Sequence, residues 1–264
     1  MNIFKYEVLK RLGTTLIWML SLGVYIYVTF AFFESFQGSA FTDILANFPD
    51  AFKKAFGLEQ DLSTIMGYFA FIGIYLFLAG AIFSSNLGLN AVSVEERDLT
   101  ADFLVSKPVT RNRIVTAKLL AGLTHLLMFN IAMGLVCWAG IESFGGGQEY
   151  SMNAFLLIMA GLFIFQLFFY AIGFIISVLL KRMDSPLPFS LGLSVGLYIL
   201  YSFDAVIRDT PIKYLVPYDY FNLGYIIENE AFKTSGLVIS IGVIVLSVAG
   251  GYVLYNRRDI ATAM

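Results

Sequence analysis

Six long stretches without a charged residue constrain this chain more than any other feature of its sequence. They cover residues 12–33, 62–94, 119–141, 150–180, 185–203 and 234–256. A helix needs about 20 residues to cross a hydrocarbon core of about 30 Å, and each stretch has that length or nearly so. Most helices of a large soluble protein would carry a polar face toward water, which these stretches lack. The pattern therefore predicts a membrane protein.

The overall composition agrees with this prediction. Only 14% of the 264 residues are charged, whereas a soluble domain needs about a quarter. We expect an all-α fold, with one transmembrane domain over residues 1–264 and six spans. The first apolar run follows Lys5, Lys10 and Arg11 and has no small-residue cleavage site behind it, so we interpret it as a span. The predicted spans cover approximately residues 13–33, 65–90, 114–141, 154–180, 186–206 and 235–256.

The distribution of lysine and arginine predicts the orientation. When the loops are assigned alternately to two sides, one side receives twelve basic residues and the other receives five. Basic residues accumulate on the cytoplasmic side of membrane proteins. Both termini are on the richer side, so we expect them in the cytoplasm. The chain would then be a multi-pass protein of the cell membrane, here a bacterial cytoplasmic membrane, in contact with its lipids.

Three shorter patterns refine this topology. Phe4, Val8 and Leu12 share one helical face, which predicts an amphipathic interfacial helix before the first span. The outer loop 207–234 is rich in tyrosine and proline, which favours short helices at the outer interface. Small residues occur at i, i+4 and i+8 in the second predicted span, as Gly80, Ser84 and Gly88. Small residues at this spacing allow close helix approach in lipid, so these three are candidates for helix packing or dimer contact.

The cytoplasmic segment between the second and third spans is the most informative part of the sequence. Ser93 and Glu96 have the spacing of a capping box, which favours a helix start at this point. Pro108 ends that helix near Ser106, because the residue before a proline avoids the helical region. The sequence therefore predicts a short cytosolic helix over approximately residues 95–106.

This helix would carry a small apolar face on an otherwise charged element. Leu99 and Phe103 are spaced i and i+4, and Leu104 lies beside them. The face could rest on the membrane surface with its apolar side chains in lipid. It could instead dock into a groove of a cytosolic partner, which is how a soluble motor would move a membrane subunit. The pattern favours the docking face.

Residues 95–118 resemble the cytosolic motif of ABC type-2 permeases, the membrane subunits of ATP-binding-cassette exporters. Thr100 takes the place of the family's threonine, and Phe103 and Leu104 take its leucine positions. The Pro-Val-Thr-Arg run at 108–111 and the lysine at 118 follow at matching spacing. Two residues depart from the pattern, because Leu99 and Ala117 replace glycines.

The resemblance implies both partners and roles. Two such permeases pair, as a homodimer or a heterodimer, and each contacts a cytosolic nucleotide-binding ATPase subunit through the cytosolic helix, the coupling helix. The implied ATPase-coupling residues in this chain are Glu95, Glu96, Arg97, Leu99, Thr100, Phe103, Leu104, Pro108 and Arg111.

Several features of the sequence weigh against other classes of activity. No Gly-x-x-x-x-Gly-Lys-Ser/Thr occurs, so ATP and Mg²⁺ would be bound by the partner subunit, and we expect no cofactor in this chain. No charged residue falls in a span core, which disfavours an ion-coupled carrier. The single histidine, His125, is a poor metal candidate, and we expect no metal site. A membrane protease of the CAAX-processing type would need arginine where Thr100 stands, so we expect no catalytic residues.

The leading hypothesis is thus the permease subunit of an ATP-driven exporter, acting by alternating access and without nucleic-acid partners. Spans rich in phenylalanine favour an amphipathic or hydrophobic substrate, such as a lipid, a drug or an antimicrobial peptide, which corresponds to multidrug or peptide efflux. The sequence does not identify the substrate-binding residues. The alternative is a membrane scaffold or channel-like protein that works without a motor.

Overall fold

The computed structural model describes residues 3–38, 47–49, 52–53, 56–58, 60–92, 109–180, 183, 185–206 and 214–257. Within this part of the chain all regular secondary structure is helical. The predicted coupling helix at 95–106 lies outside the described residues.

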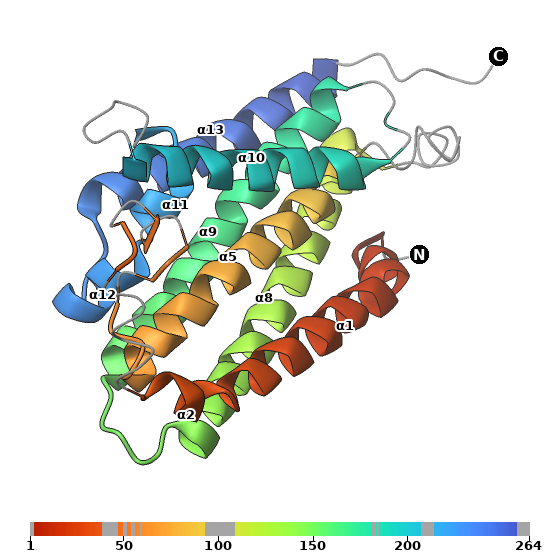
Figure 1. The fold of residues 1–264 in the computed structure, drawn as a ribbon. Helices are drawn as coiled ribbons and strands as arrows, with labels where there is room; N and C mark the ends of the chain where they lie inside the picture. The colour runs from red at the N-terminus through yellow and green to blue at the C-terminus, as the bar shows by residue number, and fades with distance from the viewer. Residues whose placement is uncertain are drawn as a thin grey trace.

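Six helices are long and apolar enough to cross a membrane, as the sequence predicts. They are α1 (Ile3–Phe30), α5 (Ile65–Leu89), α8 (Arg111–Phe144), α9 (Met152–Leu179), α10 (Pro186–Val206) and α13 (Thr234–Arg257). The short helices are α2 (Phe33–Phe36), α11 (Pro217–Tyr220) and α12 (Leu223–Asn229). The start of α1 and the end of α13 lie on the same side of the bundle, which we call the N-terminal side (Figure 1).

The first helix differs from the sequence-based expectation. The amphipathic leader and the first span form one continuous helix, α1, over 28 residues. No proline interrupts residues 3–30, so the backbone hydrogen bonds continue through both parts. At 1.5 Å per residue the helix is about 42 Å long, which exceeds the hydrocarbon core. The helix is therefore longer than a perpendicular crossing of the core requires.

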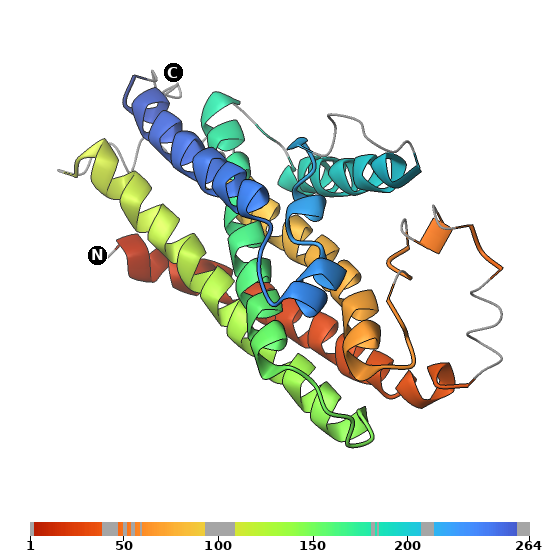
Figure 2. The ribbon, with the colours of Figure 1, turned by 90° about the vertical axis from the view of Figure 1, so that its left-hand side faces the viewer.

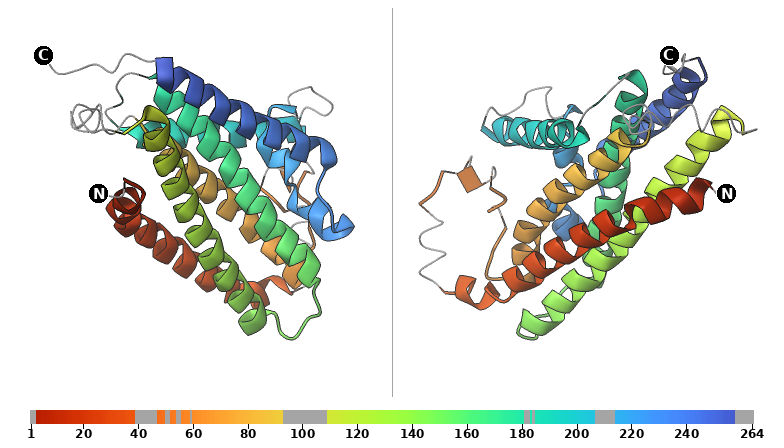
Figure 3. Two further views of the ribbon diagram at one scale, coloured as in Figure 1. Left: turned by 180° about the vertical axis from the view of Figure 1, so that it is seen from behind. Right: turned by 90° about the vertical axis from the view of Figure 1, so that its right-hand side faces the viewer.

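Helices α5 and α9 form the centre of the bundle and pack along their whole length. Helix α1 packs on α8, α13 packs on α9, and α10 packs on α5 (Figures 1 and 2). The view from behind shows α13, α9, α8 and α1 side by side (Figure 3). Helix α10 runs obliquely to the others. The most buried spans are α5 and α9, while α1, α10 and α13 keep large apolar faces exposed.

Small residues bring α5 and α9 into backbone contact. A Cβ atom on Gly173 of α9 would lie 2.5 Å from the carbonyl oxygen of Ser85, and one on Gly88 would lie 2.3 Å from that of Tyr170. The helices can approach this closely only because both positions lack a side chain. The structure places Gly80, Ser84 and Gly88 within the chain's own core, where Gly80 and Gly88 contact α9.

Residues 214–229 of the predicted outer loop pack against the bundle. Helices α11 and α12 lie over α9, α10 and α5, and the side chains of Tyr218 and Tyr220 are buried. The hydroxyl of Tyr218 donates a hydrogen bond of 3.1 Å to the carbonyl oxygen of Ser194 in α10. These two buried tyrosines therefore pack this part of the loop against the helices, and its place at the outer interface stays a prediction.

Candidate functional site

The candidate site is the N-terminal side of the bundle, where the two helices that flank segment 93–108 end and begin. Helix α5 ends at Leu89 and α8 begins at Arg111. Of the residues predicted to couple to an ATPase, Arg111 is described. The others lie outside the described residues: Glu95, Glu96, Arg97, Leu99, Thr100, Phe103, Leu104 and Pro108. The structure thus shows how the helix ends that flank the segment are anchored.

The first anchor joins α1 to the end of α5. The Arg11 guanidinium donates a hydrogen bond of 2.6 Å from Nη2 to the carbonyl oxygen of Asn90, which caps the C-terminus of α5. A helix C-terminus presents unsatisfied carbonyl groups and the negative end of the helix dipole, so a cation is favourable there. The Asn90 side chain in turn donates to the Asn86 carbonyl oxygen at 2.9 Å. The anchor lies three residues before the segment begins.

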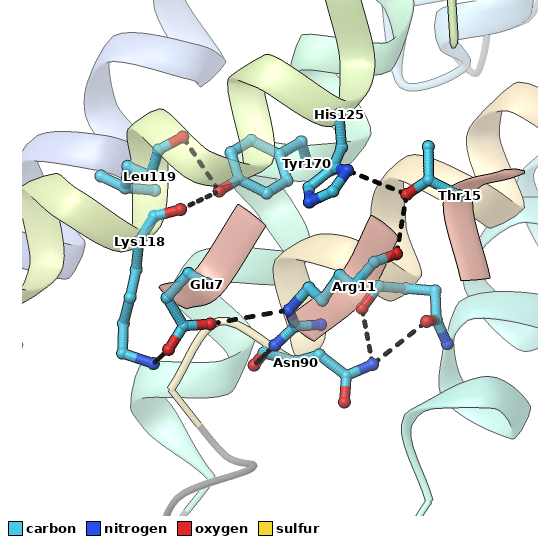
Figure 4. A network of polar contacts seen from close by, with 9 residues as sticks. Glu7, Arg11, Thr15, Asn90, Lys118, Leu119, His125 and Tyr170 are labelled. Carbon is cyan, nitrogen blue, oxygen red and sulfur yellow. Dashed lines mark hydrogen bonds and ion pairs between the residues drawn. The ribbon is translucent and has the colours of Figure 1, made fainter. Parts of the chain in front are cut away.

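A buried ion cluster joins α1 to α8 next to this anchor. The Lys118 ammonium donates to the Glu7 carboxylate at 3.1 Å, and Arg11 Nε lies 3.8 Å from the other carboxylate oxygen (Figure 4). The side chains of Lys118 and Glu7 are only 4% and 7% exposed. Charges withdrawn from water in this way must be paired, because an isolated buried charge is very costly. The cluster therefore fixes α1 relative to α8.

Polar contacts extend the cluster to α9 and further along α1. The Tyr170 hydroxyl lies 3.4 Å from the Lys118 carbonyl oxygen and 3.3 Å from that of Leu119, and it can donate to either (Figure 4). A Cβ atom on residue 122 would lie 2.1 Å from this hydroxyl, so Gly122 makes room for the ring. His125 Nδ1 lies 2.9 Å from the Thr15 hydroxyl, and both residues are buried. Four helices thus meet in one polar network.

The second anchor joins the start of α8 to the end of α13. Arg111 Nη1 donates to the carbonyl oxygens of Tyr255 at 3.3 Å and Asn256 at 3.1 Å. These carbonyls belong to the last turn of α13, so this arginine also caps a helix C-terminus. The Asn256 amide donates to Asn112 Oδ1 at 2.6 Å, which adds a second contact between the two helices.

Comparison with protein families gives a match over nearly the whole chain. The family model for the ABC-2 family transporter protein matches residues 1–260. The chain belongs to the ABC-2 transporter family. No curated protein matches its sequence significantly.

Family membership agrees with the geometry of the site. An ABC-2 permease is the membrane component of a transporter and assembles with an ATPase partner. The resemblance of residues 95–118 to the family's cytosolic motif is therefore confirmed at the level of the family. The chain is a multi-pass membrane protein. In the described residues, no group of three or more His, Cys, Asp or Glu side chains could hold a metal ion.

Sequence reasoning did not find the centre of this site. Glu7 and Arg11 fall in the stretch for which the sequence predicts an amphipathic interfacial helix. Their i, i+4 spacing was a readable signal for an ion pair on one helix. The contact of Glu7 with Lys118 joins residues 111 positions apart, and no local sequence pattern predicts it. His125, which the sequence makes a poor metal candidate, lies buried beside Thr15.

Proposed function

We propose that this ABC-2 permease is the membrane subunit of an ATP-driven exporter. It would work with a second permease and a separate cytosolic ATPase subunit, and move an amphipathic or hydrophobic substrate outward by alternating access. The observation that supports this most is the double anchor, since the end of α5 and the start of α8, which flank segment 93–108, each bind another membrane helix through an arginine. The family match over residues 1–260 supports an ATPase partner, which would be the source of movement.

The anchors suggest how movement of the segment would spread. A push by the ATPase on the segment would act on the end of α5 and the start of α8. Arg11 would pass it from α5 to α1, and the ion pair of Glu7 and Lys118 would keep α1 and α8 together. Arg111 would pass it from α8 to α13. The helices would then move as packed units, because close-packed interiors transmit strain.

The exposed apolar surface fits a permease that works as a pair in lipid. Helices α1, α10 and α13 expose large apolar side chains along much of their length. Exposed apolar area on this scale belongs against lipid or against another protein surface. A second permease on part of this surface would enclose a path lined by apolar side chains, which suits substrates such as lipids, hydrophobic drugs or amphipathic peptides.

The test distinguishes binding of the ATPase from transmission of its movement to the membrane helices. The chain is purified from its host in mild detergent, and co-purifying proteins are identified. We expect a P-loop ATPase in stoichiometric amount, with ATP hydrolysis in the eluate. Phe103→Asp should abolish its recovery, because a carboxylate on the docking face disfavours burial. Arg111→Gln should retain the ATPase but lose transport-coupled stimulation of hydrolysis, because the anchor to α13 is weakened.

Arg113→Gln is the matched control. It removes the same charge two residues away, from an exposed side chain, and we expect wild-type recovery and hydrolysis. Recovery of the chain alone, monodisperse and free of any ATPase, would overturn the proposal and favour a motor-independent scaffold or channel. Unchanged coupling in Arg111→Gln would refute the role of the second anchor.

A further inference from the structure

A cleft of about 210 Å³ lies between α1 and α5, next to the first anchor. Lys10, Arg11 and Thr14 line it from α1, and Asn86 and Asn90 line it from α5. Its remaining walls include the aromatic rings of Trp18 and Phe83. The exporter mechanism proposed above assigns no role to this cleft.

The walls of the cleft change from charged to apolar along α1 and α5. Arg11 and Asn90 mark one level, where their hydrogen bond is 2.6 Å long. Trp18 and Phe83 mark another level, with ring centroids 5.8 Å apart. Seven residues separate the two levels on each helix, which is about 10 Å at 1.5 Å per residue. Because α1 begins and α5 ends on the same side, the charged level is the one nearer the N-terminal surface (Figure 1).

This gradient matches an amphiphile with an anionic head. A phosphate at the charged level would meet the ammonium of Lys10, whose side chain is exposed, together with the hydroxyl of Thr14 and the amide of Asn86. An acyl chain would continue past Trp18 and Phe83 toward the membrane centre. A soluble anion would use only the charged level, and a purely apolar ligand would leave the polar groups of that level without partners.

The size of the cleft distinguishes a lipid head from a complete cargo molecule. Enclosed small-molecule sites have volumes of about 300–1,000 Å³. This cleft is smaller and is not enclosed, so it suits the headgroup and the first part of a chain whose remainder stays in the bilayer. Basic pockets between membrane helices are known places for anionic lipid heads.

We infer that the cleft between α1 and α5 binds an anionic phospholipid, with its phosphate at Lys10 and its acyl chain against Trp18 and Phe83. The bound lipid would bridge α1 and α5 beside the hydrogen bond that Arg11 makes to Asn90.

The experiment is lipid titration of the purified chain, followed by native mass spectrometry. The probes are dioleoyl phosphatidylglycerol, dioleoyl phosphatidylcholine and inorganic phosphate. We expect tighter binding of phosphatidylglycerol than of phosphatidylcholine. Lys10→Gln should lower the apparent affinity for phosphatidylglycerol about fivefold, the effect of one lysine near a lipid surface. Lys5→Gln, which removes an exposed charge from the same helix outside the cleft, should leave it unchanged.

A second pair of variants tests the cleft without changing charge. Thr14→Phe should fill it and displace the lipid, while Gly13→Phe should not, because a Cβ at Gly13 meets nothing within 4 Å. Equal losses in Lys10→Gln and Lys5→Gln would overturn the inference in favour of general surface attraction. Displacement of phosphatidylglycerol by inorganic phosphate would overturn the lipid assignment. Neither result depends on an ATPase partner.

Discussion

The ion pair between Glu7 and Lys118 allows a quantitative test of the polar network. With 3.1 Å between the charged atoms and an effective dielectric constant of about 20, their attraction is about 5 kcal/mol before the cost of desolvation. Removing one partner of a buried pair typically costs about 3–5 kcal/mol, because the other charge stays buried. Glu7→Gln should cost that much, since it removes the carboxylate that Lys118 and Arg11 both contact.

Thermal unfolding of the detergent-solubilised chain measures this loss. For a protein of this size, each kcal/mol corresponds to about 2–4 °C in Tm, so Glu7→Gln should lower Tm by about 6 °C or more. Lys118→Met should cost less, because Arg11 remains beside the carboxylate. The double variant Glu7→Leu/Lys118→Met should recover much of the loss, since apolar residues can replace a buried pair.

The control is Glu34→Gln, which removes a carboxylate from an exposed position on α2. A change within about 0.5 kcal/mol is expected there, as for most surface substitutions. The reasoning would be refuted if Glu7→Gln changed stability no more than this control does. It would also fail if Glu7→Leu/Lys118→Met were as unstable as the sum of Glu7→Leu and Lys118→Met measured singly, because that cycle would then show no coupling between the two side chains.

Two further predictions test other parts of the fold. Gly173→Ala should destabilise the chain by about 1–3 kcal/mol in thermal unfolding, because the added methyl overpacks the crossing of α5 and α9; Gly192→Ala, with open space around it, should not. Hydrogen bonds from Ser151 and Asn153 lower the pKa of the exposed Glu230 carboxyl. The stabilising contribution of this carboxylate is therefore present above its ordinary pKa of 4.5 and lost as pH falls through its folded-state pKa. The Tm difference between wild type and Glu230→Gln should accordingly vanish in acid. A Tm difference that does not depend on pH would contradict this.

The sequence predicts the spans well because membrane insertion is a local property. A run of about 20 apolar residues must become a helix in lipid, whatever its neighbours, to satisfy its backbone hydrogen bonds. All six predicted helices occur for this reason. The exception at α1 is instructive, because amphipathicity alone does not show whether a leader is separate from the following span. Glu7 instead turns into the protein and pairs with a distant lysine.

The candidate site was predictable in part. Arg111 follows from the resemblance to the family's cytosolic motif, but its contact with the last carbonyls of α13 does not. The pairing of Arg11 with the end of α5 joins residues 79 positions apart. Such contacts depend on which helices become neighbours, and the hydropathy of a sequence does not indicate how its helices pair.

The sequence alone therefore determined that this chain crosses a membrane six times, and its cytosolic motif indicated the transporter family. Only the tertiary structure decided that the small residues of α5 face α9 inside the chain, and that Glu7 and Lys118 share a buried site. The physical reason is that span formation is set by the transfer of each segment into lipid. Helix pairing is set by side-chain shape and buried polar contacts between segments far apart in the chain.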